Sequence, residues 1–412
     1  MRAHNSPVPS DHGHPSGGGD HGEEDFRLAY RRDLLLVNKG AAPGNFTPPD
    51  DAGELDPLQL AELLWAKDKG DAVDIGTNAE HLDRLLQGGG IAAYRVSPSR
   101  DPRELAQDFN ARNDSARASL VLVTTITGHW TYAPGTPPTG TNLSAAEVDA
   151  TVDPDKFVAV IDTGYSANGE LPEWLTARAE ALEPIDAEPP NLPGPVRGHG
   201  AFVASVIAQV AQDTNIRVAR VGNVSPSDVG TDGASAGPKI LDGFGSDELQ
   251  LYVAVARLLS AIRPDTGQPY TWQSLNLSLG SYTDDETAGL AIKEAMRLWN
   301  DATNGAPVFA AAGNHEVGDT TTERFIPAAY EPDFNICAIA SCDADGGLSD
   351  FSNDAPTKAL GRGLVGIRHD GKCWEWSGSS FATAVATASF LSSGQVPTGT
   401  TVPSPSEQPH KL

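Results

Sequence analysis

The sequence predicts an α/β fold in which helices flank a doubly wound, mostly parallel sheet, with a small α/β module preceding this domain. The first observation behind this prediction is that short, near-continuous apolar runs alternate with helical stretches in the second half of the chain. Strands that are apolar throughout are typical of parallel sheets covered by helices on both faces. The second is the length of 412 residues, which suffices for a large core without disulfide or metal support.

Five apolar runs have the length of strands. They are FVAVI (157–161), IRVARV (216–221), SLNLSL (274–279), APVFAAA (306–312) and NICAIAS (335–341). Helical stretches lie between them at 199–212, 246–262 and 283–302. Ser246 and Thr283 are suitable N-caps with acidic residues in the turn that follows, so we expect two of the helices to begin there.

Composition divides the chain into five parts. A tail rich in Gly, Pro, Ser and His (1–25) and a polar tail (396–412) are expected to be disordered. Between them we place a small α/β module (26–132), a Pro/Gly/Thr-rich linker (133–154) and the main domain (155–395).

Within the small module, three elements can be predicted. The apolar stripe from Leu58 to Trp65 has helical spacing. Residues 101–112 form a second helix with Pro102 in its first turn, and the β-branched run 119–127 forms a strand.

The charge balance excludes several classes of partner. The chain has 29 Lys and Arg against 55 Asp and Glu, a net charge of −26, which repels phosphate backbones and anionic lipid surfaces. No apolar stretch resembles a secretion signal or a membrane span. We therefore expect no nucleic-acid partner, no membrane association and a cytoplasmic location. Cys337, Cys342 and Cys373 include no CxxC pair, which favours free thiols over a single bridge.

Side chains of catalytic type follow the apolar runs, where a doubly wound sheet places its functional site. Asp162 follows the first run, Asn314 follows AAAG, and His199 and Ser380 stand at predicted helix starts. These four supply the parts of nucleophilic acyl transfer. A base activates the serine, a carboxylate holds the imidazole tautomer, and an amide donates to the oxyanion.

The motifs DTG, GHGAFVAS, LNLSLGS, AAAGN and SGSSFATA occur in this order. They resemble the signature blocks of the subtilisin-like serine proteases, the subtilases, over about Phe157 to Leu391. The resemblance implies a subtilisin-like fold and a serine endopeptidase that acts on a protein or peptide and requires no cofactor. It makes Asp162 the orienting acid, His199 the general base and Ser380 the nucleophile.

The same resemblance makes Asn314 the oxyanion donor, together with the backbone N–H of the nucleophile. An extended substrate would add as a strand to the edge segment of Ser278, Leu279 and Gly280, with Gly313 also in the substrate-binding site.

Two further properties of the family come with the resemblance. Family members often bind calcium, and Asp153, Asp155 and residues 343–345 are acidic candidates, although their spacing defines no metal site. Secreted members often carry an inhibitory N-terminal propeptide. Residues 26–132 are therefore either propeptide-like or a docking module for a regulatory partner.

The chain order Asp, His, Ser separates this family from the α/β-hydrolases, which have the order Ser, acid, His. An α/β-hydrolase needs a GxSxG elbow, and Ala382 occupies the last Gly position here. A sedolisin, from a related family of acid proteases, lacks the catalytic histidine. The chain also departs from the subtilase pattern, with Phe202 replacing the second histidine, Phe381 the methionine and Ala384 the proline. Loops 177–198 and 225–245 are unusual, and each either restricts access or is a solvated surface loop.

Three functions remain open from the sequence. The leading one is an endopeptidase that cleaves an extended segment of a protein. The second is a narrow maturation protease for a ribosomal peptide, and the third is a catalytically silent scaffold that binds a peptide strand. The intact catalytic residue types favour an enzyme.

Overall fold

The structure of the chain is a computed structural model. It describes residues 29–38, 53–55, 84–86, 88, 90–113, 116–125, 136–140, 151–165, 171–183, 186–188, 196–222, 224, 229–231, 245–282, 289–314 and 325–401. Three predicted parts of the chain lie outside these residues, namely the tail 1–25, most of the tail 396–412 and the helix around Leu58 to Trp65.

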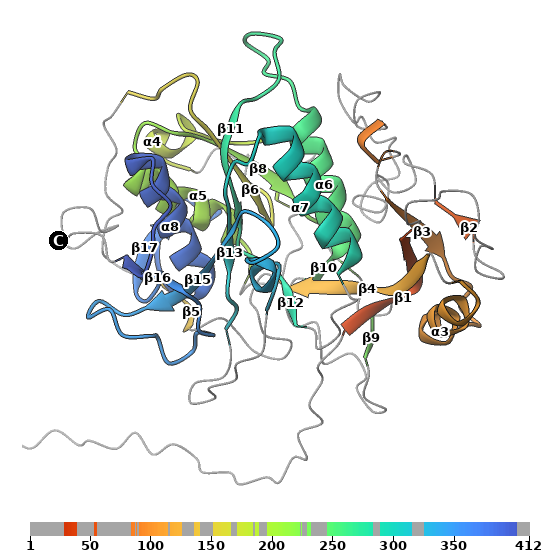
Figure 1. Ribbon diagram of the computed structural model, residues 1–412. Coiled ribbons are helices and arrows are strands. Elements are labelled where there is room, and N and C mark those ends of the chain that lie inside the picture. Colours follow the sequence, from red (N-terminus) through yellow and green to blue (C-terminus); the bar gives the residue numbers. More distant parts are fainter. Residues whose placement is uncertain are drawn as a thin grey trace, which may run out of the picture.

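An eight-stranded parallel sheet forms the centre of the main domain (Figure 1). Its strands, in spatial order, are β19 (Thr400–Thr401), β16 (Thr357–Leu360), β15 (Ile336–Cys342), β13 (Val308–Ala311), β11 (Trp272–Leu277), β6 (Phe157–Asp162), β8 (Asn215–Arg220) and β7 (Ala179–Ala181). The chain runs from β6 outward to β8 and then returns to β11 on the other side of β6. This confirms the predicted doubly wound sheet, and all five predicted apolar runs are among its strands.

Helices cover both faces of this sheet (Figure 1). The helices α5 (His199–Val210) and α8 (Ser379–Ser393) pack on one face, and α6 (Glu248–Ser260) and α7 (Leu290–Thr303) on the other. Strand β6 shows the alternation that this requires. Val158 and Val160 join the core with α5 and α8, whereas Phe157, Ala159 and Ile161 join the core with α6 and α7.

Several short elements complete the main domain. They are α4 (Glu173–Thr176), β12 (Ser281–Tyr282), β14 (Phe325–Ile326), the 3₁₀ turn η4 (Ala328–Tyr330), β17 (Leu364–Ile367) and β18 (Cys373–Ser377). Strand β12 pairs antiparallel with β14, and β17 pairs antiparallel with β18. These two small sheets lie next to the segments that carry the site.

The N-terminal module is an antiparallel sheet with one helix packed on it. It contains β1 (Ala29–Asn38), β2 (Gly53–Glu54), β3 (Ile91–Arg95), β4 (Arg117–Thr125) and α3 (Pro102–Arg112). Two short strands from the main domain, β9 (Val229–Thr231) and β10 (Gly245–Asp247), pair with β1 and β4 and make the sheet six-stranded. The predicted loop 225–245 therefore contributes strands to the module.

The module shares a core with the main domain, and the two lie side by side in Figure 1. Leu35 and Val37 of β1 pack with α3, whereas Leu34 and Leu36 point to the other face and join the core of α6 and α7. Alternate side chains of one strand therefore hold two layers together. The sequence predicts a separate module, because a local pattern does not show which face of a strand another domain covers.

Part of the linker is also ordered into the fold. Strand β5 (Thr136–Gly140) pairs antiparallel with β18, with Thr136 opposite Ser377 and Thr139 opposite Glu375. The linker thus runs beside the strand that leads directly into α8.

Both predicted N-caps differ from those in the structure. Helix α6 is capped by Asp247 in place of Ser246. The Asp247 side chain accepts from the backbone N–H of Gln250, and the Gln250 side chain accepts from the backbone N–H of Asp247. Helix α7 begins at Leu290, after Gly289 in a left-handed conformation (φ 71°), and not at Thr283.

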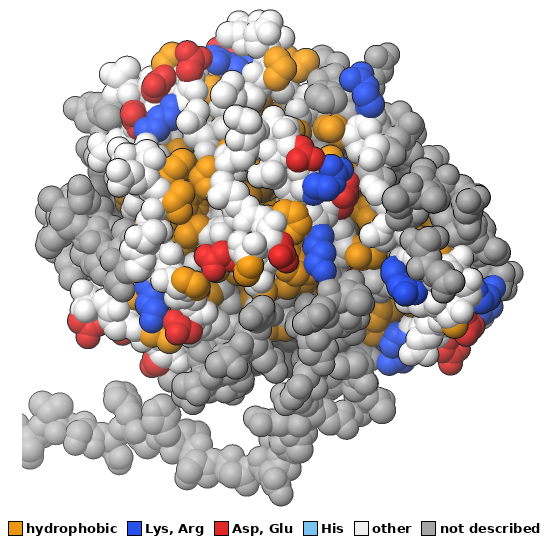
Figure 2. All heavy atoms as spheres, in the orientation of Figure 1, with side chains coloured by type: hydrophobic (Ala, Val, Ile, Leu, Met, Phe, Trp, Pro, Cys, Tyr) orange, Lys and Arg blue, Asp and Glu red, His pale blue; other side chains and the backbone are white. Residues whose placement is uncertain are grey.

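The remaining sequence predictions concern thiols and the surface. Cys337, Cys342 and Cys373 form no disulfide bond, which agrees with the thiols predicted from the sequence. On the face drawn in Figure 2, acidic and basic side chains are interspersed, and on α7 Arg297 lies 2.6 Å from Glu294 and 2.7 Å from Asp301. None of the helices in the described part of the chain has the length and apolar character needed to cross a bilayer.

Candidate active site

The four predicted catalytic residues stand at the ends of elements of the main domain. Asp162 is the last residue of β6, and Asn314 lies three residues after the end of β13. His199 is the first residue of α5, and Ser380 is the second residue of α8. Each is at most 3% exposed. Neighbouring parallel strands end at the same edge of a sheet, which is why residues so distant in sequence are brought to one region.

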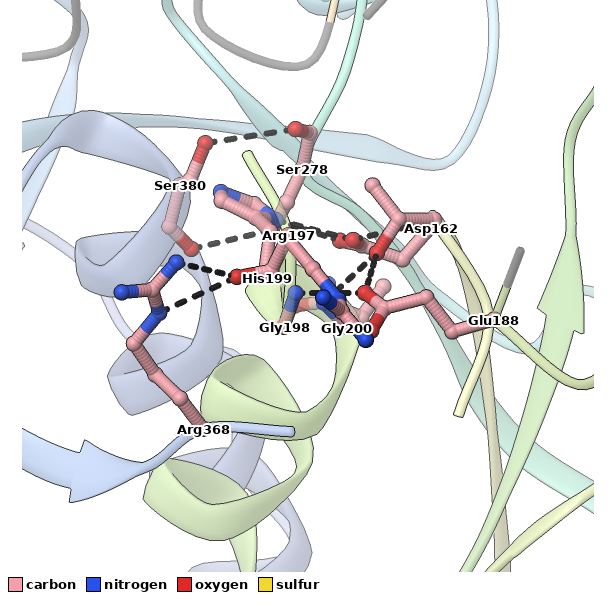
Figure 3. Close-up of polar contacts among 11 residues, drawn as sticks. Asp162, Glu188, Arg197, Gly198, His199, Gly200, Ser278, Arg368 and Ser380 are labelled. Atoms are coloured by element: carbon pink, nitrogen blue, oxygen red, sulfur yellow. Dashed lines mark hydrogen bonds and ion pairs between the residues drawn. The ribbon is translucent and has the colours of Figure 1, made fainter. Parts of the chain in front are cut away.

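Asp162 and His199 form a buried hydrogen-bonded pair (Figure 3). Nδ1 of His199 lies 2.8 Å from Oδ1 and 3.0 Å from Oδ2 of Asp162. The backbone N–H of Thr163 donates to the same Oδ1 at 2.7 Å, which fixes the carboxylate. A carboxylate at Nδ1 holds the proton on that nitrogen and leaves Nε2 as an acceptor. The pair thus has the arrangement of a general base and the acid that orients it.

Glycines allow the two motifs to approach this closely. Gly198, directly before His199, has φ 82°, a left-handed conformation that favours glycine. A Cβ on Gly200 would lie 2.2 Å from the carbonyl oxygen of Gly164. A side chain at Gly200 would therefore push α5 away from the end of β6 and break the Asp162–His199 contact.

Three aromatic side chains cluster on and around the ring of His199. The centroid of the His199 ring lies 5.2 Å from that of Trp376, edge to face, and 5.1 Å from that of Phe381. Phe202 packs against both of these aromatic rings. Two of the departures from the subtilase pattern, Phe202 and Phe381, thus belong to one apolar cluster beside the imidazole. Phe381 also adjoins Ser380, so His199 lies next to the first turn of α8.

Ser380 is tied to the predicted substrate-binding edge by two reciprocal bonds. Its Oγ donates to the carbonyl of Ser278 at 3.2 Å, and Ser278 Oγ donates to the carbonyl of Ser380 at 2.9 Å (Figure 3). Asn276 donates to Ser278 Oγ at 3.0 Å. Leu279 is buried. Gly280 packs closely against β14, since a Cβ on Gly280 would lie 2.3 Å from the carbonyl oxygen of Ile326. The edge segment therefore begins beside Ser380.

The side-chain amide of Asn314 is oriented by the start of α8. Its Oδ1 accepts from the backbone N–H of Ser379 at 2.9 Å, so the amide NH₂ is directed elsewhere. A Cβ on Gly378 would lie 3.7 Å from Nδ2, which places this NH₂ group near the segment that leads to Ser380. The start of α8 thus holds Oδ1 of Asn314 and leaves its NH₂ group beside Gly378.

The backbone around Asn314 is held by Tyr282 and Asn353, two residues that were not predicted from the sequence. Tyr282 donates from its hydroxyl to the carbonyl of Asn314 at 2.8 Å. Asn353 donates to the Tyr282 hydroxyl at 3.0 Å and to the carbonyl of Ala312 at 2.8 Å. Gly313, which lies between Ala312 and Asn314, has φ 98°, so this turn needs glycine. Tyr282 follows the edge segment LNLSLGS directly, and this was the available signal.

Glu188 is a further carboxylate that joins the two catalytic motifs (Figure 3). Its Oε1 accepts from the backbone N–H of Gly198 and, at 3.2 Å, from the hydroxyl of Thr163. The Thr163 hydroxyl in turn accepts from the N–H of Gly200 at 3.1 Å. Glu188 lies after β7 within the range 177–198, which was predicted as a loop, and no local sequence pattern identifies it. Glu188 is therefore part of the support of the site.

The ionisation of Glu188 gives a testable pH dependence. Burial raises the pKa of its carboxyl from 4.5 to about 7, although the bonds from Gly198 and Thr163 and the charge of Arg197 act to lower it. Between these two pH values the folded chain holds a proton that the unfolded chain has released, so this group makes stability fall as pH rises through the window. Glu188→Gln removes the effect.

We expect the melting temperature of the wild-type protein to fall, relative to that of Glu188→Gln, between about pH 5 and about pH 8. Thermal unfolding at both pH values measures this difference. Glu173→Gln, which changes an exposed carboxylate of α4, is the matched control and should show no such trend. A difference between wild type and Glu188→Gln that is the same at both pH values would contradict the assignment.

The acidic candidates for calcium make other contacts. Asp155 pairs with Arg263 at 2.7 Å, and Asp343 pairs with Arg362 at 2.6 Å. Asp153 Oδ1 accepts from the backbone N–H of Asp155. Among the residues that the structure describes, no group of three or more His, Cys, Asp or Glu side chains is placed to hold a metal ion. Calcium binding stays a prediction without an assigned site.

Comparison with known proteins gives a family match. The model of the subtilase family matches residues 154–396. Among solved structures, the prenylagaramide maturation protease PagA is similar with 23% identity and a TM-score of 0.40, over 60% of this chain and 80% of that one. The self-cleaved protease domain of PatA has 22% identity and a TM-score of 0.40, over 61% and 86%. A cold adapted subtilisin-like serine proteinase has 21% identity and a TM-score of 0.38, over 61% and 81%. No curated protein matches.

Proposed function

Because the chain belongs to the subtilase family, we propose that it is a serine endopeptidase whose nucleophile is Ser380, with His199 as the general base, Asp162 as its orienting acid and Asn314 as the oxyanion donor. The observation that carries this proposal is the buried bond of 2.8 Å between Asp162 and His199. A carboxylate buried against an imidazole beside a serine at a helix start is the arrangement that acyl transfer needs.

The proposed reaction begins with a rotation of one side chain. The hydroxyl of Ser380 turns from the carbonyl of Ser278 to Nε2 of His199, which accepts the proton as Oγ attacks the scissile carbonyl carbon. The imidazolium is stabilised by Asp162 and returns the proton to the leaving amine as the C–N bond breaks. Water then attacks the acyl-enzyme by the same route and releases the carboxylic acid.

Charge that develops on the carbonyl oxygen would be stabilised from two sides. The NH₂ of Asn314 is one donor, and its opposite end is fixed by Ser379. The backbone N–H of Ser380, in the first turn of the fifteen-residue helix α8, is the other. Backbone N–H groups at a helix N-terminus favour negative charge.

Labelling with a fluorophosphonate probe tests this proposal, since the probe phosphonylates only an activated serine. We expect one labelled residue, Ser380, identified by peptide mass spectrometry of the intact chain. A silent scaffold with the same fold would stay unlabelled. Labelling thus separates the endopeptidase from the peptide-binding alternative.

We also propose that residues 26–132 stabilise the main domain or control access to its site. Arg31 of β1 lies 2.6 Å from Asp247, the N-cap of α6, and both are buried. The buried Glu248 accepts from the N–H of Leu122 in β4 at 2.8 Å and from that of Ala291 in α7 at 2.9 Å. These contacts support a module that is anchored on the N-terminal ends of both helices.

The ion pair between Arg31 and Asp247 gives the test of anchoring. Arg31→Ala leaves Asp247 buried without its arginine, and breaking such a pair costs about 3–5 kcal/mol. We expect a loss of this order in the free energy of unfolding, measured with denaturant. Arg32→Ala, at the exposed neighbouring position, is the matched control and should change it by less than about 1 kcal/mol. Equal effects of both variants would refute the anchoring role.

A further inference from the structure

The side chain that precedes the scissile bond has a defined place in the proposed site. We call this substrate residue P1. The edge segment starts at Ser278, which bonds to Ser380. A second segment, which contains Gly313, ends at Asn314, and Asn314 bonds to Ser379. The two segments therefore flank the nucleophile. Because the P1 carbonyl must lie between Ser380 and the Asn314 amide, the P1 side chain enters between the edge segment and the segment of Gly313.

The aromatic ring of Phe325 packs against both of these segments. A Cβ on Gly280 would lie 2.4 Å from Cε1 of Phe325, and a Cβ on Gly313 would lie 3.0 Å from Cγ of the same ring. One ring therefore touches a glycine from each segment. Phe325 is 3% exposed, so its packing in this place is close to complete.

The strand pairing explains why this ring cannot easily leave. Residues 281–282 pair antiparallel with residues 325–326, and this places Tyr282 opposite Phe325. The two ring centroids are 4.9 Å apart. Tyr282 is held in turn by its hydroxyl bond to the carbonyl of Asn314. Movement of Phe325 would disturb the cross-strand pair and with it the support of the oxyanion residue.

We propose that Phe325 closes the P1 pocket and restricts this enzyme to substrates with a small residue, such as Gly, Ala or Ser, before the scissile bond. This inference rests on the proposed function and adds a substrate class to it. A large P1 side chain would have to displace a packed aromatic ring. Filled space of this kind discriminates by steric overlap, whose cost grows with each additional carbon of the substrate side chain.

The test uses peptides that differ only at P1, with Ala, Leu or Phe in that position. We expect kcat/KM of the wild-type protein to be at least about 100-fold higher for Ala than for Phe. In Phe325→Ala, the ratio of Ala to Phe should fall by at least about tenfold. Phe325→Leu, which keeps most of the packing, should lie between the two and serves where the alanine variant does not fold.

The matched control is Phe390→Ala. Phe390 is a partly buried phenylalanine of α8 that packs on Phe309, about 15 Å along the helix from Ser380. It should leave the P1 ratio unchanged. A wild-type protein that prefers Leu or Phe, or a ratio that neither Phe325 variant changes, would overturn the inference.

Labelling of Ser380 by the fluorophosphonate probe is measured in every sample, so that two failures can be told apart. A wild-type chain without label contradicts the proposed function itself. A labelled chain with a preference for large P1 residues contradicts only the role of Phe325.

Discussion

Replacing Ser380 with alanine is expected to abolish fluorophosphonate labelling and to lower peptide hydrolysis by roughly 10⁶-fold, because the attacking oxygen is lost and the remaining groups do not compensate for it. The fold should persist. The Ser380 hydroxyl donates to the Ser278 carbonyl at 3.2 Å, and loss of such a bond costs about 1 kcal/mol. Circular dichroism and the melting temperature check this part of the prediction.

Ser379→Ala is the matched control for Ser380→Ala. The two serines are neighbours in α8 and are both buried, but in our proposal only Ser380 is acylated. Labelling should therefore remain at Ser380 in Ser379→Ala. If the wild-type protein also cuts its own linker within residues 133–154, that cut should be missing in Ser380→Ala. Label that persists in Ser380→Ala, or that is found on Ser379, would refute the assignment of the nucleophile.

Replacing Asn314 with alanine should lower kcat by about 10²- to 10³-fold while KM changes little. The amide bonds the carbonyl oxygen fully only once that oxygen carries negative charge, so its loss acts on the transition state more than on the bound substrate. Steady-state kinetics on a peptide with Ala at P1 measures both constants.

Asn314 also accepts from the backbone of Ser379, so a structural effect of Asn314→Ala must be separated from a catalytic one. The melting temperature and the rate of fluorophosphonate labelling are therefore measured beside the kinetics. Asn300→Ala, at an exposed position of α7, is the control and should leave kcat unchanged. An Asn314→Ala enzyme with normal kcat would remove this residue from the proposed oxyanion site.

The sequence by itself determined the sheet and the candidate residues. Runs such as FVAVI and NICAIAS are apolar at every position, and this is a local property that predicts a strand covered on both faces. The order of Asp162, His199 and Ser380 is likewise present in the sequence. Together with Ala382 in the last Gly position of a GxSxG elbow, this order distinguished the subtilase pattern from that of an α/β-hydrolase. The family match over residues 154–396 agrees with it.

Only the tertiary structure decided what supports the site and what surrounds it. Glu188 and Phe325 contact the catalytic and substrate-binding segments across the fold, and no local pattern records a contact between distant segments. The same holds for the N-terminal module. Strand β1 alternates in the usual way, but only the packed structure shows that Leu34 and Leu36 face α6 and α7. Periodicity tells which side chains share a face, whereas the partner of that face depends on how the whole chain packs.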